Sequence, residues 1–175
     1  MNPVRILVAG IGNIFLGDDA FGVEVAQRML GRPQPEGVRV VDFGIRGLDL
    51  AYALLDDYDT AILVDALPRG ESPGTVYLME PHIPGAAEPI SAGLVDAHGM
   101  TPLRVLQMVH ALGGQPKRVL VVGCEPATLG DELEGAMGLS IPVEAAVGVA
   151  ISMVESLIEQ ERQVKEAISY GTYTA

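Results

Sequence analysis

The sequence is short of several residue types, and each shortage excludes a class of protein. Cys124 is the only cysteine, so an internal disulfide is impossible and a reducing compartment is expected. Tryptophan is absent, and aromatic residues make up only 5% of the chain. The core must therefore be built from aliphatic side chains, which is typical of a parallel sheet buried on both faces.

Basic residues are also scarce. The chain has 11 lysines and arginines against 23 acidic residues, which gives a formal net charge of -12. Such a charge repels a phosphate backbone, so we expect no nucleic-acid partner. The start of the chain lacks a signal-peptide pattern, and we expect no membrane-spanning helix. Together these features predict a cytoplasmic protein that binds neither nucleic acid nor a membrane, and we expect it to be a monomer.

Short apolar runs alternate with helical patterns along the chain. The predicted strands cover residues 5–9, 38–41, 60–64, 74–79 and 118–122. The predicted helices cover residues 19–30, 48–55, 101–112 and 142–160, with long loops over 81–97 and 125–141. This alternation predicts an α/β fold with a mostly parallel sheet of about five strands, covered by helices on both faces. We predict one domain over residues 1–163 and a flexible tail over residues 164–175.

Chemically active side chains follow the ends of the predicted strands. Asp19 lies beyond the first strand, Asp65 directly follows the third, and His98 closes a long loop before a helix. Asp42, Cys124 and Glu125 stand at the ends of other strands. Ligands of parallel α/β sheets bind beyond the carboxyl ends of the strands, so these side chains are expected at one edge.

Asp19, Asp65 and His98 form a set of two carboxylates and one imidazole. Such a set suits nickel, zinc, iron or manganese, with positions left open for water or a substrate. The set lacks thiolates, and the sequence has no His-Glu-x-x-His, so neither a structural zinc site nor an ordinary zinc metallopeptidase is indicated. Asp65 is the most telling member, because burying an unpartnered carboxylate after an apolar strand is costly.

Each candidate also has an ordinary structural interpretation. Asp18 or Asp19 can cap the following helix, Asp65 can bind a loop backbone, and His98 can be a surface histidine. Cys124 can be a nucleophile, although free cysteines are more often small core residues. On these residues alone, the alternatives stay open.

The Gly-Ile-Gly run over residues 10–12 also begins a dinucleotide-binding fingerprint. That fingerprint requires glycine or alanine at its sixth position, where this chain has Phe15. The acidic pair at 18–19 would repel a pyrophosphate there. Gly12 and Asn13 tolerate a positive φ, and the Asn13 amide can tie the loop down. The segment therefore predicts a turn that presents a carboxylate instead of holding a phosphate.

The segment from residue 6 to residue 23, ILVAGIGNIFLGDDAFGV, resembles the N-terminal signature of the hydrogenase maturation proteases. Further similar blocks follow in the family's order: DFGIRG at 42–47, ILVDA at 62–66, the histidine at 98, VVGCEP at 121–126 and GLSIPVE at 138–144. The resemblance covers residues 5 to about 160. It implies a three-layer αβα fold and an endopeptidase that removes a C-terminal extension from the nickel-loaded large-subunit precursor of a nickel–iron hydrogenase.

The resemblance also implies that Asp19, Asp65 and His98 are the catalytic residues and contact nickel. That nickel belongs to the substrate, so no resident cofactor is expected. Hydrolysis can use metal-activated water or a carboxylate pair, and both mechanisms stay open. A nickel-binding maturation chaperone without proteolysis is the alternative function, and a degenerate nucleotide-binding domain is the third.

The resemblance assigns a substrate loop to Gly44, Arg46 and Gly47. Family members often have threonine where this chain has Ile45. A hydroxyl contact with the substrate is therefore not expected at that position, and Arg46 is the candidate to bind acidic or carbonyl groups of the bound tail.

Overall fold

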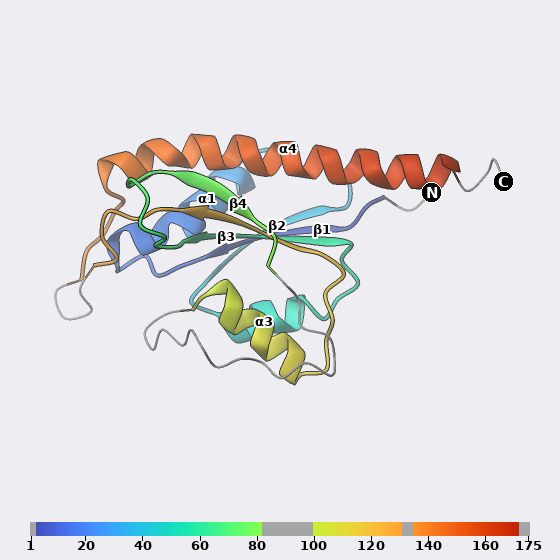
Figure 1. The fold of residues 1–175 in the computed structure, drawn as a ribbon, viewed down its shortest axis with the longest axis horizontal. Helices are drawn as coiled ribbons and strands as arrows, with labels where there is room; N and C mark the ends of the chain where they lie inside the picture. Colours follow the sequence, from blue (N-terminus) through green and yellow to red (C-terminus); the bar gives the residue numbers. More distant parts are fainter. Residues whose placement is uncertain (1–2, 82–99, 131–134, 172–175) are drawn as a thin grey trace.

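The structure is a computed structural model that describes residues 3–81, 100–130 and 135–171. A five-stranded sheet has the strand order β2-β1-β3-β5-β4 (Figure 1). Its strands are β1 (Ile6–Ile11), β2 (Val38–Gly44), β3 (Thr60–Ala66), β4 (Val76–Met79) and β5 (Val119–Cys124). All neighbours are parallel except β4, which runs antiparallel to β5. The predicted α/β fold with a mostly parallel sheet is confirmed.

Helices cover both faces of this sheet. On one face lie α1 (Phe21–Leu30) and α4 (Ile141–Gly171), and on the other lie α2 (Gly47–Ala53) and α3 (Pro102–Ala111) (Figure 1). Ile6 and Val8 of β1 pack in the α1–α4 layer, whereas Leu7 and Ala9 pack in the α2–α3 layer. Because neighbouring strand residues face opposite ways, a strand buried on both faces has to be aliphatic throughout.

One predicted helix start is confirmed, and another is wrong. The predicted start of α3 is confirmed, because the Thr101 hydroxyl accepts a hydrogen bond from the Arg104 backbone N–H at 3.3 Å. Helix α1, however, begins at Phe21, since Gly17–Ala20 form a separate 3₁₀ turn, η1. Neither η1 nor α1 has a side-chain cap bond. The capping interpretation of the two acidic residues is therefore wrong.

Helix α4 is longer than the sequence indicated. It continues from Ile141 to Gly171, whereas the predicted helix ended at residue 160. Beyond its last core contacts, Glu161 accepts a hydrogen bond from the Thr60 hydroxyl at 2.7 Å, and Lys165 lies 3.1 Å from an Asp59 carboxylate oxygen. These contacts to the sheet support the extra turns. The mobility of residues 164–175 stays a prediction.

By length and composition, the Ile141–Ile168 part of α4 is apolar enough to cross a bilayer, with a mean hydropathy of 1.7. The sequence had predicted no such helix. Within the fold, 44% of its most apolar window is buried, and α4 packs against α1 and β5. The core-facing side of α4 therefore accounts for much of its apolar character.

A glycine brings α1 against the sheet. A Cβ atom on Gly22 would lie 2.0 Å from the Val64 carbonyl oxygen and 2.4 Å from that of Ile11, so no larger residue fits. Phe15, which stands at the sixth position of the fingerprint, is 58% exposed in the preceding loop, and its atoms are not among those nearest to that Cβ. The close packing of α1 on β1 and β3 keeps the η1 turn next to the strand ends.

Candidate functional site

The loop after β1 folds Asp19 back over the strand ends. Oδ2 of the half-buried Asp19 accepts a hydrogen bond from the Asn13 backbone N–H at 2.8 Å. Gly12 has a φ of 141°, and a Cβ there would lie 1.8 Å from the Asp19 carbonyl oxygen. The Asn13 side-chain oxygen accepts from the Phe15 N–H at 3.0 Å, as predicted, although Asn13 does not use a positive φ. The loop therefore presents a carboxylate.

Asp65 lies at the carboxyl end of β3 and is 1% exposed. Its Oδ1 atom is buried and has no hydrogen-bond partner among the described residues. Burial, followed by the negative charge of Asp19, raises the Asp65 pKa well above its ordinary value, and a backbone hydrogen bond from Ala66 opposes this only partly. Asp19 lies in η1, which contacts β3, so the fold brings these two carboxylates to one edge, where the charge of Asp19 acts on Asp65.

The Asp19 pKa is also raised, because burial outweighs the hydrogen bond from Asn13. Two neighbouring acids of this kind can share a proton or bind a cation. Leaving a buried acceptor such as Asp65 Oδ1 without a donor costs about 1–3 kcal/mol, and a bound cation would remove that cost. No group of three potential metal ligands occurs within the described part of the chain. His98, the third predicted ligand, lies outside the described residues.

The other three strand-end residues, Asp42, Cys124 and Glu125, lie in surroundings that indicate structural roles. Asp42 lies within β2 and accepts a hydrogen bond from Gln27 Nε2 at 3.1 Å. Burial, helped by the charges of Asp18 and Glu125, raises the pKa of the Cys124 thiol to about 11, which disfavours a nucleophilic role.

Glu125 anchors the connection between β3 and β4. Its carboxylate accepts backbone N–H bonds from Arg69 at 2.6 Å and Gly70 at 3.2 Å. Burial of the carboxylate acts to raise its pKa, but these hydrogen bonds outweigh that effect and lower it. Glu125 therefore has its acceptors filled by its own chain.

The predicted substrate loop is held largely by internal contacts. Arg46 donates hydrogen bonds to the backbone carbonyls of Asp42 and Phe43, so its guanidinium is turned back onto its own loop. A Cβ on Gly47 would lie 1.9 Å from the Met100 sulfur, so this glycine makes room for that side chain. Gly44 joins this loop to the loop that follows β1, since its carbonyl accepts a hydrogen bond from the Gly12 N–H at 3.1 Å.

A groove of about 370 Å³ lies between the loop that follows β1, here called the first loop, and the end of β2 with the loop that follows it, here called the second loop. It is lined by residues 12–15, Val23, Gln27 and residues 42–46. Ile14, Phe15 and Ile45 line it and are 43%, 58% and 63% exposed. Asn13 belongs to this groove and also holds Asp19, so an apolar-walled groove adjoins the carboxylate pair.

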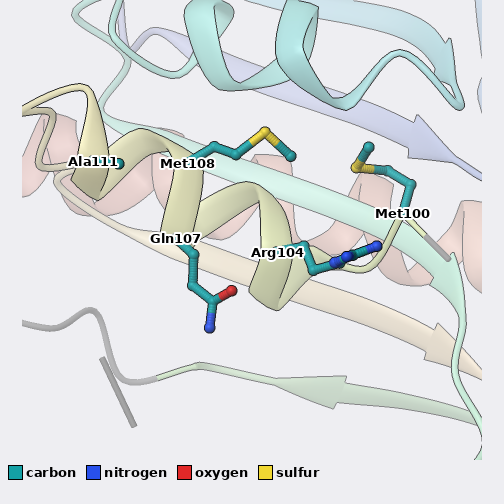
Figure 2. A pocket seen from close by; sticks show the side chains of 5 residues that line it. All are labelled: Met100, Arg104, Gln107, Met108 and Ala111. Atoms are coloured by element: carbon teal, nitrogen blue, oxygen red, sulfur yellow. The ribbon is translucent and has the colours of Figure 1, made fainter. Parts of the chain in front are cut away.

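A second pocket, of about 480 Å³, lies along α3 (Figure 2). It is lined by Met100, Arg104, Gln107, Met108 and Ala111. In Figure 2 the Met100 and Met108 side chains extend to the same side, and Gln107 points away from them. The described residues of this lining include no carboxylate, imidazole or thiol, so the carboxylate pair and its groove form the better candidate site.

Asp18 has a role that the sequence did not indicate. It is fully buried, and it accepts hydrogen bonds from the 127–128 segment and from Ser140. Asp19 beside it contacts Asn13 instead. The only available sequence signal was an acidic doublet before a helix, and that signal does not tell the two residues apart.

Known proteins resemble this chain over most of its length. A family model described as hydrogenase maturation protease matches residues 23–157. The hydrogenase expression/formation protein HupD of Bradyrhizobium diazoefficiens is 30% identical over 97% of this chain and 93% of that protein. The hydrogenase 2 maturation protease of Escherichia coli K12 is 29% identical over 90% of this chain and 92% of that protein.

The fold is similar to a solved structure as well. The hydrogenase maturating endopeptidase HybD from E. coli aligns with a TM-score of 0.69 at 28% identity, over 90% of this chain and 93% of that one. The sheet order, the carboxylate pair at the strand ends and these similarities lead to one conclusion. The chain belongs to the hydrogenase maturation protease family, and it is a hydrolase that acts on peptide bonds.

Proposed function

We propose that this protein removes the C-terminal extension of a nickel–iron hydrogenase large-subunit precursor and recognises nickel already bound to that precursor. Asp19, Asp65 and His98 would be its ligands to the substrate's nickel, and the protein would need no resident cofactor. The observation that carries this proposal is Asp65 Oδ1, a buried acceptor with no donor among the described residues, beside the Asp19 carboxylate. The similarity to a maturation protease and to an endopeptidase supports peptide-bond cleavage.

The electrostatics of the pair favour a cation. Each carboxylate is disfavoured in its charged form by burial, and Asp65 additionally by the charge of Asp19. A divalent cation between them would reverse that repulsion, and its binding would release protons. Carboxylate oxygens and an imidazole suit nickel, and such a site leaves positions for ligands that come from the substrate.

The two carboxylates differ in a way that suits hydrolysis. Before nickel binds, Asp65 is the one to hold a proton, because it is almost fully buried and has the more strongly raised pKa; nickel binding would release that proton. Asp19 is half-buried, so it is the one to take a proton from water. That water attacks the scissile carbonyl carbon, the C–N bond breaks, and the departing amine takes the proton that Asp19 received from the water. Substrate nickel would polarise the water or the carbonyl.

The groove between the first and second loops is the proposed site for the substrate chain next to the cleaved bond. Its exposed apolar side chains suit an extended peptide with apolar residues. The guanidinium of Arg46 is already used by its own loop, so we assign it to shaping the groove.

The test compares two forms of the precursor. Purified protein is mixed with nickel-loaded and with nickel-free precursor, and the mass of each product is measured. We expect only the loaded form to lose its C-terminal peptide. Equal cleavage of both forms would refute nickel recognition and leave the peptidase activity intact. A stable complex without mass loss would instead favour a chaperone.

A further inference from the structure

We infer that Asp18 is a positioning residue for Asp19. It ties the η1 turn to the connection between β5 and α4, and so holds the Asp19 carboxylate at the strand ends. This inference rests on the proposed function only for its activity measurement, because the placement of Asp19 can be measured separately.

The Asp18 carboxylate is 0% exposed and is surrounded by donors. Its Oδ2 accepts from the backbone N–H groups of Ala127 at 2.8 Å and Thr128 at 3.1 Å, and from the Ser140 hydroxyl at 2.9 Å. Its Oδ1 accepts from the Ser140 backbone N–H at 2.6 Å. A carboxylate can only accept hydrogen bonds when ionised, and burying it is tolerated when donors of this kind surround it. One side chain thus joins three separate parts of the chain.

Backbone hydrogen bonds reinforce this junction. The Gly17 N–H donates to the Ala136 carbonyl at 2.7 Å, and the Ala136 N–H donates to the Phe15 carbonyl at 2.8 Å. The Asp18 N–H donates to the Thr128 carbonyl at 3.2 Å. The β5–α4 connection therefore holds the η1 turn, and the Asp18 carboxylate lies at the centre of the contact.

Asp19 depends on this support because its own turn is short. The turn spans four residues and has no side-chain cap, and the one described hydrogen bond of the Asp19 carboxylate comes from Asn13. Neighbouring side chains on a 3₁₀ helix point about 120° apart, so Asp18 can bind the connection while Asp19 faces the strand ends. A group on a loop has to be held by such contacts to stay within reach of its reaction.

The test uses Asp18→Asn, which keeps the shape of the side chain. Asparagine has one acceptor oxygen and one NH₂ group, so it would place a donor against donors in this pocket. The matched control is Asp59→Asn at the opposite edge of the sheet. Asp59 also accepts a backbone N–H, from Arg5 at 3.0 Å, and lies 3.1 Å from Lys165. The control therefore removes another hydrogen-bonded carboxylate, one that is partly exposed and lies at the opposite edge of the sheet from Asp19.

The first measurement is hydrogen exchange at the Asn13 amide, which donates to Asp19 at 2.8 Å. At matched global stability, we expect about 10-fold faster exchange in Asp18→Asn than in Asp59→Asn, with no difference at Val8 in β1. The second is kinetics on nickel-loaded precursor. We expect kcat of Asp18→Asn to fall about 100-fold with KM nearly unchanged, as a misplaced reacting group requires. Asp59→Asn should keep its kcat per folded molecule.

If Asp18→Asn does not fold, Ser140→Ala decides the question, because it removes only the hydroxyl donor. We then expect about 3-fold faster exchange at Asn13 and a similar loss of kcat. The inference is overturned if the variant and the control show equal exchange at Asn13 and equal kcat per folded molecule. Asp18 would then only stabilise the fold. If the wild type cleaves nothing, the proposed function fails, and the exchange measurement still decides the role of Asp18.

Discussion

Acidic residues at the two edges of the sheet have opposite surroundings. At the amino edge, Asp59 lies 3.1 Å from Lys165, and Glu161 lies 2.5 Å from Arg118. At the carboxyl edge, Asp65 Oδ1 has no partner among the described residues, and Asp19 accepts a backbone N–H from Asn13. The same type of side chain is thus paired with cations at one edge and with other acids or backbone at the other.

The pKa directions follow this difference. Burial acts to raise the pKa of Asp59, but hydrogen bonds from Arg5 and Lys165 outweigh it and lower that pKa. The hydrogen bond from Lys117 lowers the pKa of Asp57. At the carboxyl edge, burial raises the pKa of both Asp19 and Asp65. Charge at the amino edge therefore stabilises the fold, whereas the charges of Asp19 and Asp65 at the carboxyl edge are costly, as expected at a functional site.

The largest expected effect comes from removing a carboxylate at each edge in turn. Asp19→Ala should lower the cleavage rate about 1000-fold, because both a proton acceptor and a nickel ligand are lost. Asp57→Ala, at the exposed amino edge, should leave the rate unchanged. Product mass spectrometry with loaded precursor measures both rates. Full activity of Asp19→Ala would refute the site assignment.

The second effect concerns stability at the carboxyl edge. Because the folded pKa of Asp65 is raised, the folded state keeps a proton that the unfolded state has lost, so the contribution of Asp65 to stability falls as pH rises above about 4. Asp65→Asn avoids this cost and should be more stable than wild type near neutral pH by about 1–3 kcal/mol, while losing activity. Urea unfolding from pH 4 to pH 8, with chelator present, measures the difference. A difference that shrinks as pH rises would contradict this prediction.

The third effect has the opposite sign and lies at the amino edge. The folded pKa of Asp59 is lowered, so its contribution is present above about pH 4 and is lost as pH falls through the folded pKa. Asp59→Asn should lower the free energy of unfolding by about 1 kcal/mol at neutral pH, and the deficit should shrink below pH 4. The same urea series measures it. If both aspartate variants shift stability in the same direction, the two edges are not opposites.

The smallest effect asks how far the functional edge extends into the groove. Ile45 is 63% exposed, so Ile45→Ser should leave the melting temperature almost unchanged. We expect its KM for loaded precursor to rise about 3-fold, with kcat unchanged, because an apolar contact is lost equally before and during reaction. Leu112→Ser, 41% exposed beyond the end of α3, is the control. An unchanged KM for Ile45→Ser would remove this position from the proposed substrate contact.

Much of the fold could be predicted because its signals are local. Aliphatic runs marked all five strands, and the Thr-Pro pair marked the start of α3. The end of α4 could not be predicted, because Glu161 and Lys165 bind residues about a hundred positions away. The antiparallel direction of β4 likewise depends on its pairing with β5 and not on its own residues.

The placement of Asp19 and Asp65 at the same edge could be predicted from local sequence, since the carboxyl ends of parallel strands meet there. The contacts of each acidic residue, by contrast, depend on how the chain folds. Asp18 and Asp19 are neighbours of the same type, yet one is buried among donors 109 to 122 residues away and the other contacts Asn13. Arg46 was predicted to bind the substrate, but in the folded loop its guanidinium donates a hydrogen bond to the Phe43 carbonyl. The physical reason is that hydrogen bonds and burial depend on which distant segments meet, and local sequence does not specify those partners.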